Sequence, residues 1–145
     1  MPEQSDNRRP KKSGARHRAR KRAVDLLFEA ADVLHPAFIK IGSEQGSRTT
    51  DLSELVAPLR DIAEEAIAHG TRIAIEPMPF SIIDSIPAAA ELIRAAGHPA
   101  AGLLIDAWHV FRAGTTIGDL ARSLTPEMIF GVELDEDVRA HLTDG

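Results

Sequence analysis

The sequence predicts an α/β fold with about four parallel strands, preceded by a basic disordered arm and one helix. Four short apolar runs begin near residues 38, 72, 102 and 129. They lie roughly 30 residues apart, which is the period of βα units. The runs are almost continuously apolar, as expected for parallel strands covered on both faces. Three of them end in a carboxylate residue, so the sequence also predicts acidic side chains at the carboxyl edge of the sheet.

The N-terminal segment is predicted to be a basic arm over residues 1–15 and a helix over residues 16–35. The arm is polar and charged, contains Pro10 and Gly14, and has little to bury. The helix is indicated by apolar residues spaced three and four apart, and Pro36 ends it. The residues expected on its apolar face are Ala23, Leu26, Leu27, Ala30, Ala31 and Leu34.

The α/β part of the chain is predicted over residues 36–145. The expected strands are 38–41, 72–75, 102–105 and 129–132, and the expected helices are 51–69, 86–96 and 116–123, on one outer face. Ser85 and Gly97 are suited to begin and end the second of these helices. Thr116 and Asp119 fit a capping box at the start of the third.

Composition excludes several kinds of site. The chain has no Cys, so it has neither disulfides nor thiolate metal sites. No apolar run approaches the roughly 20 residues that span a bilayer, and the basic N-terminus lacks the apolar core of a secretory signal. We therefore expect a cytoplasmic protein without membrane contact. The net charge of −5 is unevenly distributed, because nine of the 17 Lys and Arg lie in residues 1–22.

The strand-end carboxylates are Glu76, Asp106 and Glu133. Neighbouring buried carboxylates repel one another and are costly to desolvate unless a cation neutralises them. Oxygen ligands with an imidazole suit Mn²⁺ or Mg²⁺, and less specifically Zn²⁺ or Co²⁺. Such an ion stabilises the enediolate formed when a proton leaves the carbon beside a carbonyl, and a carboxylate can move that proton. The alternative is that each carboxylate caps a turn or pairs with Arg.

The segments 75–80 (IEPMPF) and 104–109 (LIDAWH) resemble the xylose isomerase-like barrel family, with a match over about residues 37–136. That family of metal-dependent sugar isomerases, epimerases and endonucleases places Glu at the end of the fifth strand of a TIM barrel. It places Asp at the end of the sixth strand, with His three residues later. The resemblance implies that Glu76 and Asp106 bind metal, that Glu76 also acts as a base, and that His109 contacts substrate.

The resemblance also bears on residues near this motif. Glu133 stands where many members have a His ligand on the seventh strand, and it is therefore a third predicted ligand. Trp108 either stacks on a sugar or packs at the mouth of the barrel. The chain would supply the fourth to seventh strands, so the resemblance implies a partial TIM barrel, truncated or chimeric, with weak metal binding. We expect an inner face open to solvent and self-association that covers it.

The segment 12–30 (KSGARHRARKRAVDLLFEA) resembles the opening of the transcription antitermination factor NusB, whose basic arm and first helix contact RNA. This resemblance implies RNA contacts through Arg16, Arg18, Arg20, Lys21 and Arg22.

The sequence thus leaves three interpretations open. The first is metal-assisted proton transfer on a sugar, polyol or sugar phosphate. The second is RNA binding through the basic segment, and the third is a chimeric product without function.

Overall fold

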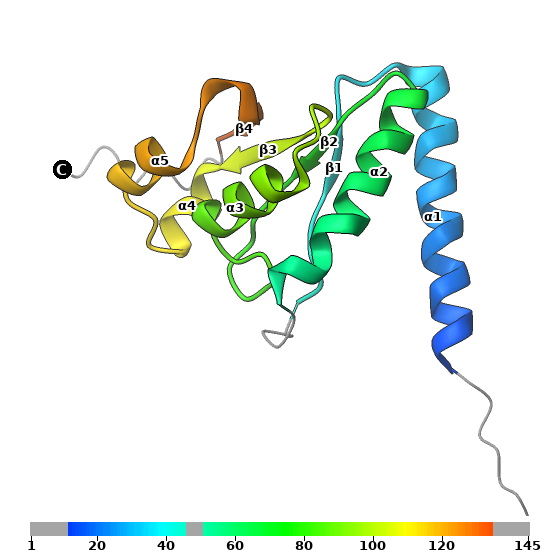
Figure 1. The fold of residues 1–145 in the computed structure, drawn as a ribbon, viewed down its shortest axis with the longest axis horizontal. Coiled ribbons are helices and arrows are strands. Elements are labelled where there is room, and N and C mark those ends of the chain that lie inside the picture. The colour runs from blue at the N-terminus through cyan, green and yellow to red at the C-terminus, as the bar shows by residue number, and fades with distance from the viewer. Residues whose placement is uncertain (1–11, 46–50, 135–145) are drawn as a thin grey trace, which may run out of the picture.

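The structure, a computed structural model, describes residues 12–45 and 51–134. The elements in chain order are α1 (Lys12–Leu34), β1 (Ile39–Ile41), η1 (Leu52–Leu55), α2 (Val56–Ala68), β2 (Ile73–Ile75), α3 (Ile86–Ala96), β3 (Ala101–Asp106), α4 (Ala107–Arg112), α5 (Ile117–Ser123), η2 (Pro126–Met128) and β4 (Ile129–Glu133). The strands form one sheet in the order β1-β2-β3-β4, and each neighbouring pair is parallel (Figure 1). The predicted α/β fold and strand order are confirmed.

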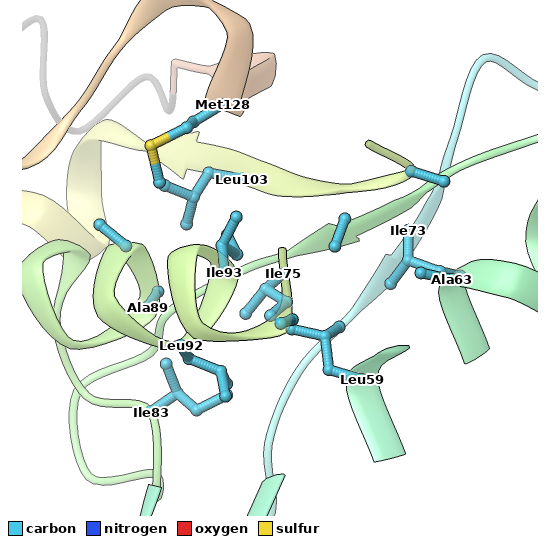
Figure 2. Close-up of a cluster of buried hydrophobic side chains, with 14 of the residues drawn as sticks. Leu59, Ala63, Ile73, Ile75, Ile83, Ala89, Leu92, Ile93, Leu103 and Met128 are labelled. Atoms are coloured by element: carbon cyan, nitrogen blue, oxygen red, sulfur yellow. The ribbon is translucent and has the colours of Figure 1, made fainter. Parts of the chain in front are cut away.

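One face of the sheet is covered by helices. The sequence predicted helices on one outer face, where α2 packs against α3 and α3 packs against α5. Beneath them Ile73, Ile75 and Leu103 are buried in a continuous apolar cluster with side chains of α2 and α3 (Figure 2). Full burial of an aliphatic side chain of this size contributes about 1.5–3 kcal/mol, so this face supplies much of the stability of the fold.

Local signals place the helix ends as expected. Ser85 is the N-cap of α3, and Gly97 ends that helix in a left-handed conformation with φ 60°. Thr116 and Asp119 form the predicted capping box of α5. The sequence analysis missed α4, which follows β3 without an intervening loop.

Helix α1 differs from its prediction in its start and in its buried face. It begins at Lys12, so residues 12–15, which were predicted to belong to the arm, are part of the helix. Residues 1–11 of the predicted arm lie outside the described residues. Among the described side chains of α1, Phe28 and Ala31 are buried, whereas Leu26 and Leu27 are about half exposed. Phe28 stacks on His69 at the end of α2, with the ring centroids 4.8 Å apart. The helix is thus fixed by the face that meets α2, and its other apolar stripe is exposed to solvent.

The inner face of the sheet lies opposite the helices. It was predicted to be open to solvent, but its centre is buried. Ala74 and Leu104 are 0% and 2% exposed, although they lie outside the cluster beneath the helices. Phe38 reaches across this face toward Gly131 of β4, where an added Cβ would lie 3.0 Å from its ring. Phe130, at a register shift in the β3–β4 pairing, packs on Gly102. The expectation was wrong here because aromatic side chains at the two edges cover the centre.

β1 and β4 form the edges of the sheet, since each has one strand neighbour among the described elements. Self-association that covers the inner face stays a prediction. Within the parts of the chain that the structure describes, no helix has both the length and the apolar character needed to cross a membrane.

Candidate metal centre

Two carboxylates meet at the carboxyl edge of the central strands. Asp106 is the last residue of β3, and Glu76 directly follows β2, where its backbone N–H donates to the carbonyl of Ile41 at 2.9 Å. Because β2 and β3 are adjacent and parallel, their ends emerge side by side. The period-2 alternation of the strands directs both carboxylates to the inner face, since Ile75 and Leu103 face the helices.

His109 reaches the same place through α4. One carboxylate oxygen of Asp106 accepts from the backbone N–H groups of Trp108 at 2.8 Å and His109 at 3.2 Å. Asp106 is therefore the N-cap of α4, and its capping fixes the direction in which that helix leaves the sheet. Nε2 of His109 then lies 3.9 Å from the second oxygen of Asp106 and 3.7 Å from an oxygen of Glu76.

The three side chains fit a divalent metal. Glu76, Asp106 and His109 each offer one ligand atom, and all three atoms lie within 4.8 Å of one another. Two ligand atoms at about 2.1 Å from a tetrahedral ion are roughly 3.4 Å apart, close to the separations of His109 from the two carboxylates. The side chains are 10%, 14% and 25% exposed, so the two acids are largely removed from water. A donor set of two carboxylates and one imidazole suits Mn²⁺, Zn²⁺ or Co²⁺.

Lys40 is part of this centre, and the sequence analysis overlooked it. Its Nζ lies 3.4 Å from both oxygens of Glu76 and 3.1 Å from the nearer oxygen of Glu133. The hydrogen bond to Glu133 raises the pKa of Lys40 above its ordinary value, and the charge of Glu76 acts in the same direction against the opposing effect of burial. The sequence signal for this role was a lysine flanked by two isoleucines in a three-residue strand. Because side chains alternate along a strand, the lysine lies on the face opposite the isoleucines, which is the inner face.

Glu133 and Trp108 stand apart from the group of three. Glu133 is in register with Asp106 on the neighbouring strand, but its carboxylate pairs with Lys40. Trp108 lies on α4, with its ring 6.3 Å from that of Phe111 and the Arg112 guanidinium 5.4 Å from it. The ligand role of Glu133 and the sugar contact of Trp108 stay predictions.

The predicted RNA-binding side chains lie on the exposed surface of α1. Arg18, Arg20, Lys21 and Arg22 are exposed, and the side chain of Arg16 lies outside the described residues. Arg20 pairs with Glu44 at 3.0 Å, and Lys21 pairs with Asp25 at 3.1 Å. RNA contact stays a prediction. RNA binding that weakens steeply with added salt would support it.

Comparison with known proteins shows the family to which this fold belongs. A profile described as the xylose isomerase-like TIM barrel matches residues 11–145. The chain belongs to this family. The match includes all of α1, so the family extends further toward the N-terminus than the resemblance over residues 37–136 indicated. The likeness of α1 to the antitermination factor stays a prediction. Among curated proteins, none matches the sequence.

Several solved structures share the fold. The IolI protein, described with a bound zinc atom, has a TM-score of 0.73 and 20% identity over 89% of this chain and 47% of its own. A xylose isomerase-like TIM barrel/4-hydroxyphenylpyruvate dioxygenase fusion protein has a TM-score of 0.70 and 24% identity over 81% of this chain and 19% of its own. The 3-keto-D-glucoside 4-epimerase YcjR from E. coli has a TM-score of 0.65 and 15% identity over 80% and 50%.

These likenesses show the fold, since identity is low in each. The chain spans half or less of the length of each of these three proteins. The ligands and activities of those longer proteins are therefore only proposals for this chain.

Proposed function

We propose that this chain carries the metal-binding and proton-transfer residues of a sugar isomerase or epimerase. The observation that carries the proposal is the convergence of Glu76, Asp106 and His109 within 4.8 Å at the carboxyl ends of adjacent strands. Active sites of TIM barrels lie at this end of the strands. The zinc described in the IolI structure and the epimerase activity named for YcjR support the same class.

Glu76 and Asp106 would hold a divalent cation. Asp106 uses one oxygen to cap α4 and has the other directed toward His109, so it can bind an ion without losing the cap. When bound, the cation supplies charge that stabilises the enediolate left by removal of a proton beside a carbonyl. His109 directs Nε2 to the same point, where it can ligate the ion or donate to a substrate oxygen.

Proton transfer would fall to Glu76. Its side chain is 10% exposed, and one of its oxygens lies 3.7 Å from Nε2 of His109, so it adjoins the candidate metal centre with little solvent around it. The proton would leave a carbon beside the carbonyl and move to a Glu76 oxygen. Its return to the neighbouring carbon, with a hydroxyl proton passing from one substrate oxygen to the other, gives an isomer. An epimer requires a second acid that delivers a proton to the opposite face of the same carbon.

Metal binding is the first test of this proposal. A thermal melt with millimolar Mn²⁺ should show a higher midpoint than a melt without metal, because a ligand of the folded state stabilises it by RT ln(1+[L]/Kd). Glu76→Gln and Asp106→Asn should each remove most of the rise. Glu91→Gln on α3 and Asp61→Asn on α2 are matched controls at exposed carboxylates, and they should retain it. A midpoint that Mn²⁺ leaves unmoved would contradict the proposal.

Proton transfer is tested without knowledge of the substrate. Incubation with a panel of ketoses and aldoses in D₂O should place deuterium beside the carbonyl of those the site accepts, as proton NMR detects. Glu76→Gln should abolish the exchange. His109→Gln should also abolish the exchange. If this variant loses metal affinity as well, His109 is a metal ligand. If it retains metal affinity, His109 contacts the substrate.

A further inference from the structure

Lys40 contacts the Glu76 carboxylate of the candidate metal centre. It is the middle residue of β1, and its neighbours Ile39 and Ile41 pack against the cluster beneath the helices. Its side chain therefore projects from the inner face. There Nζ lies 3.4 Å from both oxygens of Glu76, so it contacts the carboxylate that the proposed metal also requires.

The same ammonium reaches the opposite edge of the sheet. β1 and β4 are separated by β2 and β3, and in a flat sheet their axes would lie about 14 Å apart, three spacings of about 4.8 Å. Yet Nζ of Lys40 is 3.1 Å from Glu133 of β4. The approach of Phe38 to Gly131 indicates the same inward curvature. The curved sheet thus brings two carboxylates from different strands to one lysine.

We propose that Lys40 is a built-in competitor of the metal ion. It neutralises Glu76 while the site holds no metal, and it must leave Glu76 when the ion binds. Glu133 keeps the displaced ammonium at the site and thereby assists metal binding without being a ligand. This inference rests on the proposed function of the site, and it names the residue that sets how tightly the site takes its metal.

The physical reason is charge. A largely buried carboxylate is costly without a cation nearby, so the metal-free site needs the ammonium. A divalent ion and an ammonium repel each other and use the same lone pairs of Glu76. Part of the metal's binding free energy is therefore consumed in displacing Lys40. The cost is reduced because Glu133, 48% exposed, can hold the ammonium from the solvent side.

The test replaces Lys40 by Met, a side chain of similar length without charge. Titration calorimetry with Mn²⁺ should give a Kd about tenfold lower for Lys40→Met than for wild type, the factor that corresponds to one charged hydrogen bond no longer broken. Co²⁺ gives a second readout, because a bound paramagnetic ion quenches nearby tryptophan emission. Trp108 is the only Trp in the chain and stands two residues from Asp106.

Controls separate competition from bulk charge and from misfolding. Lys21→Met removes the same charge from α1, where Lys21 pairs with Asp25, and should leave the Kd within about twofold of wild type. Lys40→Gln retains a hydrogen-bond donor without the charge and should also tighten binding, so it serves if the Met variant does not fold. Circular dichroism confirms folding of each variant.

The outcomes are distinguishable. If wild type binds Mn²⁺ and both Lys40 variants bind it no more tightly, the competition is refuted while the proposed metal site stands. If neither wild type nor variants bind metal, the proposed function and the competition both fail.

A double-mutant cycle with Glu133 separates its two roles. Glu133→Gln should weaken Mn²⁺ binding several-fold in the wild-type background, because the ammonium then has only Glu76 to pair with. In the Lys40→Met background the same change should have no effect on the Kd. An equal loss in both backgrounds would make Glu133 a ligand and would overturn its assignment as the acceptor of Lys40.

Discussion

The two faces of the sheet alternate residue by residue along β2 and β3. Ile73, Ile75 and Leu103 face the helices and are buried in a continuous apolar cluster. Ala74 and Glu76 face the other way, toward the interior of the curve. The strand period of 2 therefore lets neighbouring residues of one short strand serve stability on one side and chemistry on the other. A substitution's effect should depend on the face it lies on more than on its distance along the chain from the site.

The inner face is itself divided along the strands. Near the amino ends, Phe38 and Phe130 close over Gly131 and Gly102. The guanidinium of Arg72 lies 3.9 Å from the Phe130 ring centroid, which holds that ring in place. At the carboxyl ends the face is polar and carries the candidate metal centre. The aromatic end keeps a four-stranded sheet covered, which leaves the polar end free for binding.

The largest effect is expected on the helix-covered face. Leu103→Ala should lower the free energy of unfolding by about 2–5 kcal/mol, because Leu103 is fully buried and truncation leaves a cavity. Chemical denaturation measures the change. Ile67→Ala is the control on α2, where the side chain is 49% exposed, and it should cost far less. Equal losses at the two positions would contradict the burial of Leu103 beneath the helices.

A smaller effect is expected where the inner face is closed. An added Cβ at Gly102 would lie 2.6 Å from the Phe130 ring, so Gly102→Ala must displace that ring from beneath Arg72. Overpacking of this kind costs about 1–3 kcal/mol. Gly118→Ala in α5 is the control, because its nearest contact is the flexible end of Arg122 and alanine favours a helix. A Gly102→Ala variant as stable as wild type would show that the aromatic end is loosely packed.

Local signals explain which parts of the fold were predictable. Short apolar runs in the sequence predicted the strands. The capping residues Ser85 and Thr116 directly precede the helices that they begin, so they too could be identified locally. The proximity of Glu76 and Asp106 was predictable for the same reason, since parallel strands bring their ends together without knowledge of packing.

Contacts distant in sequence were not predictable. The pairing of Lys40 with Glu133 and the closure by Phe38 depend on sheet curvature, which neither segment encodes alone. The buried face of α1 was mispredicted because its sequence offers two apolar stripes, and the stacking of Phe28 on His69 selects one. Helix α4 was missed because the alternative for Asp106 was a capped turn, whereas Asp106 caps a whole helix.

The smallest effect concerns α5, which covers the margin of the core face and relies on its own cap. The Asp119 carboxylate accepts from the Thr116 hydroxyl at 2.6 Å and from its backbone N–H at 3.0 Å, and it pairs with Arg122. The bond from the Thr116 hydroxyl is the main cause that lowers the pKa of Asp119 below its ordinary 3.8. A carboxyl with a depressed pKa in the folded state contributes stability above its unfolded pKa, and that contribution is lost as the pH falls through the lower folded value.

The difference in unfolding free energy between wild type and Asp119→Asn should therefore be constant at neutral pH and shrink below about pH 4. Denaturation at a series of pH values measures this difference. Asp61→Asn is the control, because it removes the same charge from an exposed position of α2. A difference that persists unchanged at pH 2 would mean that the ionised form of Asp119 adds nothing to the cap. The margin of the core face would then depend on packing with α3 rather than on the local charge of α5.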